Sequence, residues 1–479
     1  MTSHLASMAG LVTVLFLLMF PHEASAEQSV LSYLYQDFQN PNDRKALANL
    51  IGETRTSPDL SADHAYSRAE DFLSEQPPVE LEAEAVNPMN LAAGRWLANA
   101  AIFDTHAGRP DQGQIFLTEA LAMLGADSTP FSPHLFNAVI ARGITAYQLD
   151  DFEQAREDFH WGQNILHRNE GVLTFSQAEI LNWLTRVHLS DKELFKADTQ
   201  QRFLLRVAEE HFEDDHETLT AIKQNVAEYL GQRASLISPL EDEPTRAVRQ
   251  AMFAESLTLL EELIETLEQR AGFTSIELIN PLRALARIRH LQGTGFRLAE
   301  GPLERVLSIL QSQENLDDED LAQAWLDLGD GRVLSGNPLS QDAYRQAWTL
   351  LASSTPEAIE RFNAPVMLLP KKITPLYLER WPTKTEPGEA LYTDLSLIVT
   401  EEGKTKGVKI IDRTVSAKYS RWARSRLSYS RFRPAVQDGE PVSQTIELRQ
   451  PFEVLEKASE ERDEAEKAAV MDDSSAAGS

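Results

Sequence analysis

The residues with the clearest capacity for chemistry are two histidines that flank a run of acidic side chains, from His211 to His216. Histidine and carboxylate side chains are common metal ligands, so this segment could hold a cation. Charged loops between helices often have this composition without a metal, and we therefore expect no metal site here. The chain contains no G-x-S-x-G, no H-E-x-x-H and no phosphate-binding glycine-rich loop. The sequence thus favours a binding protein over an enzyme, and we expect no cofactor.

A candidate binding site is the last predicted strand, from Thr445 to Val454. Alternation turns Ile446 and Leu448 toward one face. As the final strand it is expected at a sheet edge, where unpaired N–H and C=O groups can bind an extended peptide. Pro451 lacks an N–H, so pairing should be confined mainly to the residues before it. The expected peptide-binding residues of this strand are Thr445, Ile446, Glu447, Leu448 and Arg449.

The residues before this strand predict a small β-β-α-β unit that begins near Tyr392. Alternating apolar residues from Leu395 to Val399 lead into a turn at Glu402-Gly403. A second apolar run, from Val408 to Ile411, completes the pattern of a β-hairpin. A helix follows the hairpin, and the last strand closes the unit.

The predicted helix places four residues on one face: Tyr419, Trp422, Ala423 and Leu427. We expect Tyr419 and Trp422 to be core residues that pack the helix on its sheet. Five arginines on and after the helix could form a basic surface, although a solvated face is the simpler interpretation: Arg421, Arg424, Arg426, Arg431 and Arg433.

This order of elements resembles the C-terminal domain of TonB, the periplasmic energy transducer of Gram-negative bacteria. Three segments carry the resemblance: V-T-E-E-G-K-T-K-G-V-K-I-I from Val399, R-F-R-P-A-V-Q-D-G-E-P-V from Arg431, and the closing P-F-E-V. The resemblance implies capture of a segment from a TonB-dependent outer-membrane receptor or another envelope protein. It also implies that Phe432, Arg433 and Pro434, which match the family's R-[FY]-x-P element, shape the same site. An inner-membrane motor complex is a further implied partner.

The amino terminus predicts a cleaved signal peptide over residues 1–26. An apolar run from Met8 to Phe20 precedes Ala24-Ser25-Ala26, a small-x-small cleavage pattern. The run is shorter than the roughly 20 residues of a membrane-spanning helix, so we expect a periplasmic protein without a membrane span. The alternative is an uncleaved leader that anchors the chain in the inner membrane. The chain has no cysteine, which excludes a lipid-modified cysteine, a thiolate nucleophile and a cysteine zinc site.

Residues 27–361 predict an all-α solenoid. Apolar and small residues follow a single helix face after Phe136 and again after Phe152. Glycines at positions 143 and 162 would let two antiparallel helices approach closely, with Phe159 as the large residue between them. This spacing is similar to that of tetratricopeptide (TPR) repeats. We expect roughly four to six helix pairs.

The repeat period is longer than that of a standard TPR. Gly113 and Ala155 occupy the same phase 42 residues apart, against about 34 in a typical repeat. The segment from Ala208 to Leu219 resembles repeats of the kinesin light chain type. The register is lost between Gln232 and Thr274, where a loop is expected around Pro239.

The remaining segments complete an α+β multidomain organisation, with the solenoid followed by the small β-β-α-β domain over residues 391–455. Five prolines interrupt residues 362–390, which predicts a packed, extended connection rather than a helix. The acidic tail, residues 456–479, is expected to be disordered.

The net charge of −29 lies mainly in the helical region. Residues 362–454 hold 15 Lys and Arg against 11 Asp and Glu. An acidic surface repels nucleic acid and anionic lipid, so we expect neither as a partner. Two functional hypotheses remain: a TonB-like transducer or adaptor, and a periplasmic interaction scaffold with no role in energy transduction.

Overall fold

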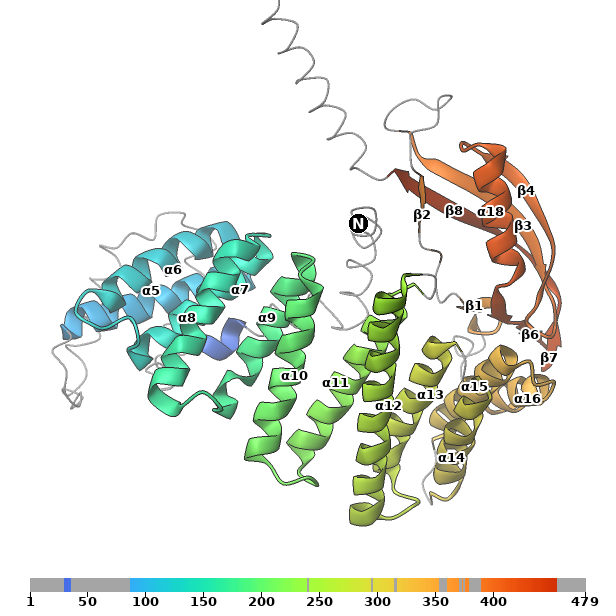
Figure 1. The fold of residues 1–479 in the computed structure, drawn as a ribbon, viewed down its shortest axis with the longest axis horizontal. Helices are drawn as coiled ribbons and strands as arrows, with labels where there is room; N and C mark the ends of the chain where they lie inside the picture. Colours follow the sequence, from blue (N-terminus) through green and yellow to red (C-terminus); the bar gives the residue numbers. More distant parts are fainter. Residues whose placement is uncertain are drawn as a thin grey trace, which may run out of the picture. The chain divides into compact units, whose positions relative to one another are not determined.

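The computed structural model describes residues 30–35, 87–238, 241–293, 296–313, 317–352, 360–369, 373, 375–378 and 389–454 (Figure 1). The predicted signal peptide and the tail 456–479 lie outside these ranges, as do most of residues 27–85. The described residues fall into two compact units, one ending at Ile222 and one beginning at Lys223.

Helices make up the described chain as far as residue 351 (Figure 1). The α-helices are α5 (Pro88–His106), α6 (Pro110–Gly125), α7 (Phe136–Gln148), α8 (Phe152–Glu170), α9 (Ala178–Ser190), α10 (Leu194–His211), α11 (Glu217–Ser235), α12 (Glu243–Ala271), α13 (Ile279–Gln292), α14 (Glu300–Gln311), α15 (Asp318–Ser335) and α16 (Ser340–Leu351). Short 3-10 helices are η2 (Leu31–Tyr33), η4 (Pro133–Leu135), η5 (Phe175–Gln177), η6 (Ile276–Leu278) and η7 (Phe296–Ala299). Within each unit, neighbouring helices pack together, which gives helix pairs from α5/α6 to α15/α16. The predicted helical repeats are therefore present, and the described residues contain six pairs.

The loops inside the first three pairs share one geometry at a spacing of 42 residues. Gly108, Asp150 and Lys192 have φ angles of 77°, 59° and 62°. In each loop the amide of the next residue donates to the carbonyl five residues earlier, at 2.7 to 2.9 Å. This pairing closes a helix end in the Schellman manner, which requires a left-handed residue. Asp150 and Lys192 adopt this conformation although glycine favours it more.

Small residues allow the paired helices α7 and α8 to approach closely. A Cβ atom at Gly143 would lie 2.9 Å from the ring of Phe159. Phe159 is fully buried and stacks on Trp183, with the ring centroids 5.7 Å apart. A Cβ at Gly162 would overlap the side chain of Ile140. The predicted close approach around Phe159 is confirmed.

The pair α11/α12 explains where the sequence period is lost. Helix α12 has 29 residues, against 19 in α8 and 18 in α10. Within the unit that begins at Lys223, Ser256 of α12 donates to the carbonyl of Ala227 in α11 at 2.6 Å. Gly231 of α11 packs against Ile288 of α13. The close approach through a small residue thus continues although the spacing has changed.

Strands follow the helices (Figure 1). They are β1 (Val366–Leu369), β2 (Leu376–Leu378), β3 (Leu391–Val399), β4 (Thr405–Arg413), β5 (Arg431–Arg433), β6 (Ala435–Gln437), β7 (Glu440–Val442) and β8 (Gln444–Val454), with helix α18 (Ala417–Ser428) after β4. One sheet has the order β2-β8-β3-β4, while β1 pairs with β5 and β6 pairs with β7. The described parts of residues 362–390 include β1 and β2, which are extended and paired with β5 and β8.

Helix α18 packs on one face of the four-stranded sheet. Leu395 and Leu397 of β3 share a buried cluster with Ala423 and Leu427 of α18. Ser420 and Thr393 form a buried hydrogen bond at 3.0 Å.

The expectation that Trp422 belongs to this core is wrong, because half of its surface is exposed. The buried face of α18 follows Ser420, Ala423 and Leu427, and a helix turns by about 100° per residue, which carries Trp422 off that face. Tyr419 is partly buried and contacts the ring of Phe452 edge-on at 6.3 Å.

Among the described residues, no helix is both long enough and apolar enough to cross a membrane.

Candidate functional site

Strand β8 is paired on one side from Gln444 to Phe452 and on the other side only at its end. It runs antiparallel to β3 in an unbroken register, from Gln444 opposite Val399 to Phe452 opposite Leu391. On its other side, β2 pairs with residues 452–454 alone. In the described part of the chain, no strand pairs with this outer side between Thr445 and Arg449.

The hydrogen bonds of Tyr392 identify which groups of β8 point outward. Its N–H donates to Thr414 at 2.8 Å and its carbonyl accepts from the Thr414 amide at 3.1 Å, so both groups face away from β8. Pro451, opposite Tyr392, therefore directs its backbone away from β3. Because the direction alternates along a strand, the N–H and C=O groups of Thr445, Glu447 and Arg449 also point to the open side.

The other end of the sheet is a less suitable edge. Strand β4 pairs with β3 through two breaks in register, and Gly407 has a φ angle of 63°. Lys406 and Lys409 are exposed on this strand. Bulges and lysines prevent an edge strand from pairing with another chain. The regular edge of β8 lacks these features between Thr445 and Arg449.

The side chains of β8 divide between the two faces of the sheet. Ile446 and Leu448 pack against the core, as predicted. Glu447 is exposed. Arg449 binds both carboxylate oxygens of Asp394 at 2.8 Å and lies 3.9 Å above the ring of Tyr392. The hydrogen bond from Arg449 lowers the pKa of Asp394, so this pair stays ionised beside the edge.

Phe432, Arg433 and Pro434 do not lie on this edge. Phe432 is 1% exposed, Pro434 is also buried, and the strand β5 that contains Phe432 and Arg433 pairs with β1. Arg433 instead reaches Asp330 of α15, with Nε–Oδ1 and Nη2–Oδ2 distances of 2.9 and 2.6 Å. The expectation that these three residues share a site with β8 is therefore corrected. The ring of Phe432 packs in the core between the sheet and α18, while Arg433 fastens β5 to the last helix pair. We call this contact region the joint.

Burial and charge both act on the polar groups of the joint. Burial disfavours the charge of Arg433, but hydrogen bonds and attraction from Asp330 outweigh it and raise the pKa of the guanidinium. Tyr344 donates to Asp330 at 3.0 Å, and burial followed by the charge of Asp330 raises the pKa of its hydroxyl. Burial also raises the pKa of Asp327, against the attraction of Arg283 at 2.9 Å.

Apolar contacts reinforce the joint. Val436 of β6 belongs to a buried cluster with Phe362 and residues of α15 and α16, and its amide donates to the Phe362 carbonyl at 2.9 Å. A Cβ at Gly439, between β6 and β7, would lie 3.2 Å from the ring of Trp348 in α16. The last helix pair and the strands β5 to β7 thus share one interior.

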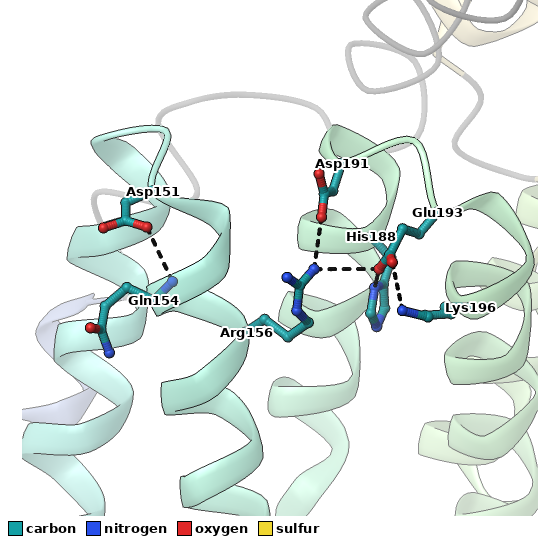
Figure 2. A network of polar contacts seen from close by, with 7 residues as sticks. All are labelled: Asp151, Gln154, Arg156, His188, Asp191, Glu193 and Lys196. Atoms are coloured by element: carbon teal, nitrogen blue, oxygen red, sulfur yellow. Dashed lines mark hydrogen bonds and ion pairs between the residues drawn. The ribbon is translucent and has the colours of Figure 1, made fainter.

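A separate polar network lies in the unit that ends at Ile222. Figure 2 shows Arg156 of α8 reaching the loop between α9 and α10, where it pairs with Asp191 at 2.7 Å and Glu193 at 3.4 Å. Glu193 also accepts from Lys196 and contacts His188 at 2.8 Å. Burial lowers the pKa of His188, although Glu193 acts in the opposite direction. These contacts join one repeat to the next.

The histidine segment that could have held a metal has a packing role in the structure. The ring of His216 stacks on Phe212 at 4.4 Å, and its Nδ1 accepts from the amide of Thr218 at 3.1 Å. Across the described ranges, no group of three or more His, Asp or Glu side chains is placed to hold a metal ion.

Comparisons with known proteins concern the fold. No protein-family model matches the chain, and no curated protein matches it. The kinesin light chain TPR-like repeats from Podosopora anserina are 14% identical with a TM-score of 0.37, over 46% of this chain and 97% of that one. BtubC from P. vanneervenii is 15% identical with a TM-score of 0.27, over 64% and 92%. A Rap protein in complex with Competence and Sporulation Factor is 13% identical with a TM-score of 0.30, over 64% and 77%. At these values the likeness carries no functional argument, and the TPR-like repeats rest on the helix pairs described above.

Proposed function

We propose that this protein is an interaction adaptor that binds an extended peptide along β8 and presents a second binding surface on its helical repeats. The open side of β8 is the observation that carries the proposal. Outward N–H and C=O groups at Thr445, Glu447 and Arg449 offer a regular ladder to one additional strand. Main-chain hydrogen bonds of this kind supply affinity, while exposed neighbours such as Glu447 select among peptides.

The resemblance to the TonB C-terminal domain supplies the source of the peptide. We propose a periplasmic protein whose ligand is an extended segment of a TonB-dependent outer-membrane receptor. The regular, uninterrupted register of β8 supports strand addition at this edge. The repeats would hold a second envelope protein.

The joint favours an adaptor over a TonB-like energy transducer. A transducer must carry its terminal domain across the periplasm, whereas here Arg433 and Val436 fix the sheet to the last helix pair. Energy transduction would then require a membrane partner that moves the repeats and the sheet together. A scaffold that binds no receptor segment is the second candidate.

A titration with receptor peptides tests the proposal. The full-length protein is titrated with labelled peptides from candidate receptors, and fluorescence anisotropy reports binding. Glu447→Pro removes one outward N–H without removing a bond to β3, so it should abolish binding while far-UV circular dichroism stays unchanged. Glu447→Ala is the matched control, because it deletes the same side chain and keeps the N–H.

The two variants separate the hypotheses. Loss of binding in Glu447→Pro with retention in Glu447→Ala supports strand addition. Equal binding by both variants would place the peptide elsewhere. No binding of any receptor peptide to the unmodified protein would favour the scaffold.

A further inference from the structure

An exposed stripe on α18 combines aromatic and cationic side chains. Trp422 is 50% exposed, and Tyr429, the residue that caps the helix, is 76% exposed. They are seven residues apart, which is two helical turns, so both lie on one side of the helix. Lys418 and Arg421 are exposed on the same side. We call these four residues the α18 stripe.

The stripe is positively charged, and no acidic residue of α18 balances this charge. Helix α18 contains Lys418, Arg421, Arg424 and Arg426 and no acidic residue. In the described ranges, neither Lys418 nor Arg421 forms an ion pair. A half-exposed tryptophan beside such cations suits a segment that carries carboxylates and some apolar surface.

The chain itself supplies such a segment next to this helix. Residues 455–479 carry eight Asp and Glu against three Lys and Arg, together with Leu455, Val470 and Met471. The segment follows Val454, two residues after Phe452, whose ring contacts Tyr419 in the first turn of α18 at 6.3 Å. Strand β8 therefore ends near the first turn of α18, the helix that carries the stripe.

The dimensions also agree. Helix α18 has 12 residues, which is about 18 Å at 1.5 Å per residue. An extended chain covers that length with about six residues at roughly 3.3 Å each. Counted from Val454, Glu456 and Glu460 fall within that reach. Exposed ion pairs are individually weak, but tethering holds the segment at an effective concentration on the order of millimolar.

We propose that the acidic segment 455–479 docks on the α18 stripe of its own chain, with its carboxylates on Lys418 and Arg421 and its apolar residues against Trp422. The contact is electrostatic in the main and is therefore weakened by salt. This inference does not depend on peptide binding at β8.

A tryptophan-quenched fluorophore tests the docking in the full-length protein. Because the chain has no cysteine, Ser459→Cys offers a unique site for a bimane label. Contact with Trp422 should quench the label, and Trp422→Phe should raise its emission about twofold or more. High salt should give the same rise, since the Debye length falls from about 10 Å at 0.1 M to about 3 Å at 1 M.

A matched pair of charge reversals identifies the surface. Lys418→Glu lies on the stripe and should release the label. Lys409→Glu makes the same change on β4. Lys409 lies opposite Ser396 of β3 and is not part of the α18 stripe, so this variant should leave the emission unchanged. Far-UV circular dichroism checks that each variant folds.

Each other outcome contradicts the proposal. If Trp422→Phe leaves the emission of the label unchanged, the segment does not reach the stripe. Quenching that survives both salt and Lys418→Glu means that charge does not hold it there. Quenching that disappears on dilution means that the contact is between copies rather than within one chain.

Discussion

The joint and the β8 edge are two regions of one small β domain with opposite chemistry. At the joint, Arg433 binds Asp330 through two hydrogen bonds and Val436 is 2% exposed. At the edge, the backbone of Glu447 points away from the sheet, and no described strand pairs with it. Both regions carry the sequence resemblance to TonB. Only the edge offers unsatisfied groups to a partner, so shared motifs do not by themselves mark a shared site.

The largest expected effect is the loss of the buried ring of Phe432, next to Arg433 of the joint. Phe432→Ala should lower the free energy of unfolding by about 3 to 5 kcal/mol, because the ring is almost fully buried and leaves a cavity. Tyr429→Ala removes an aromatic ring that is 76% exposed, and the change should stay within about 0.5 kcal/mol. Urea denaturation of both variants makes the measurement. A loss below about 1 kcal/mol for Phe432→Ala would mean that the core between the sheet and α18 is not packed around this ring.

A smaller effect is expected from the ion pair of the joint. Asp330→Ala should cost about 2 to 3 kcal/mol, because it leaves the largely buried guanidinium of Arg433 without its partner. The double variant Asp330→Leu with Arg433→Leu should recover much of this loss, since it removes both charges. Denaturation curves of the single and double variants decide the matter. A loss in the double variant equal to the sum of the two single losses would show that the pair is not coupled.

The pKa values of two carboxylates, Asp327 at the joint and Asp394 beside the β8 edge, are expected to shift in opposite directions. Burial raises the pKa of Asp327 at the joint above the ordinary value of 3.8, so folding gains stability from this group as pH falls through the raised pKa. The hydrogen bond from Arg449 lowers the pKa of Asp394 at the edge, so its contribution is present above 3.8 and is lost as pH falls through the lowered pKa. Carboxyl carbon NMR should find Asp327 titrating above Asp394. The reverse order would contradict the burial of one group and the pairing of the other.

The regular parts of the fold could be predicted because local patterns specify them. Apolar periodicity located α7 and α8, and Gly143 and Phe159 marked their contact. The hairpin turn at Gly403 follows from the same kind of local signal, and the structure gives this glycine a φ angle of 73°. The left-handed residues Asp150 and Lys192 had no such signal, since neither is glycine.

The joint was missed because it depends on residues far apart in the sequence. Arg433 and Asp330 are separated by 103 positions, and nothing local to either residue indicates the other. The R-[FY]-x-P motif pointed to binding, whereas the structure uses it for packing. Asp330 lies between Gly329 and Gly331, and an acidic residue between two glycines of a helix is a signal that could have been followed.

Amide hydrogen exchange along β8 tests the central claim most directly. In the free protein, the amides of Thr445, Glu447 and Arg449 should exchange fast, while those of Ile446 and Leu448, which bond to β3, should exchange slowly. Addition of a binding receptor peptide should slow the first group and leave the second unchanged. Slow exchange at Glu447 in the free protein, or protection by the peptide confined to residues outside β8, would contradict the account.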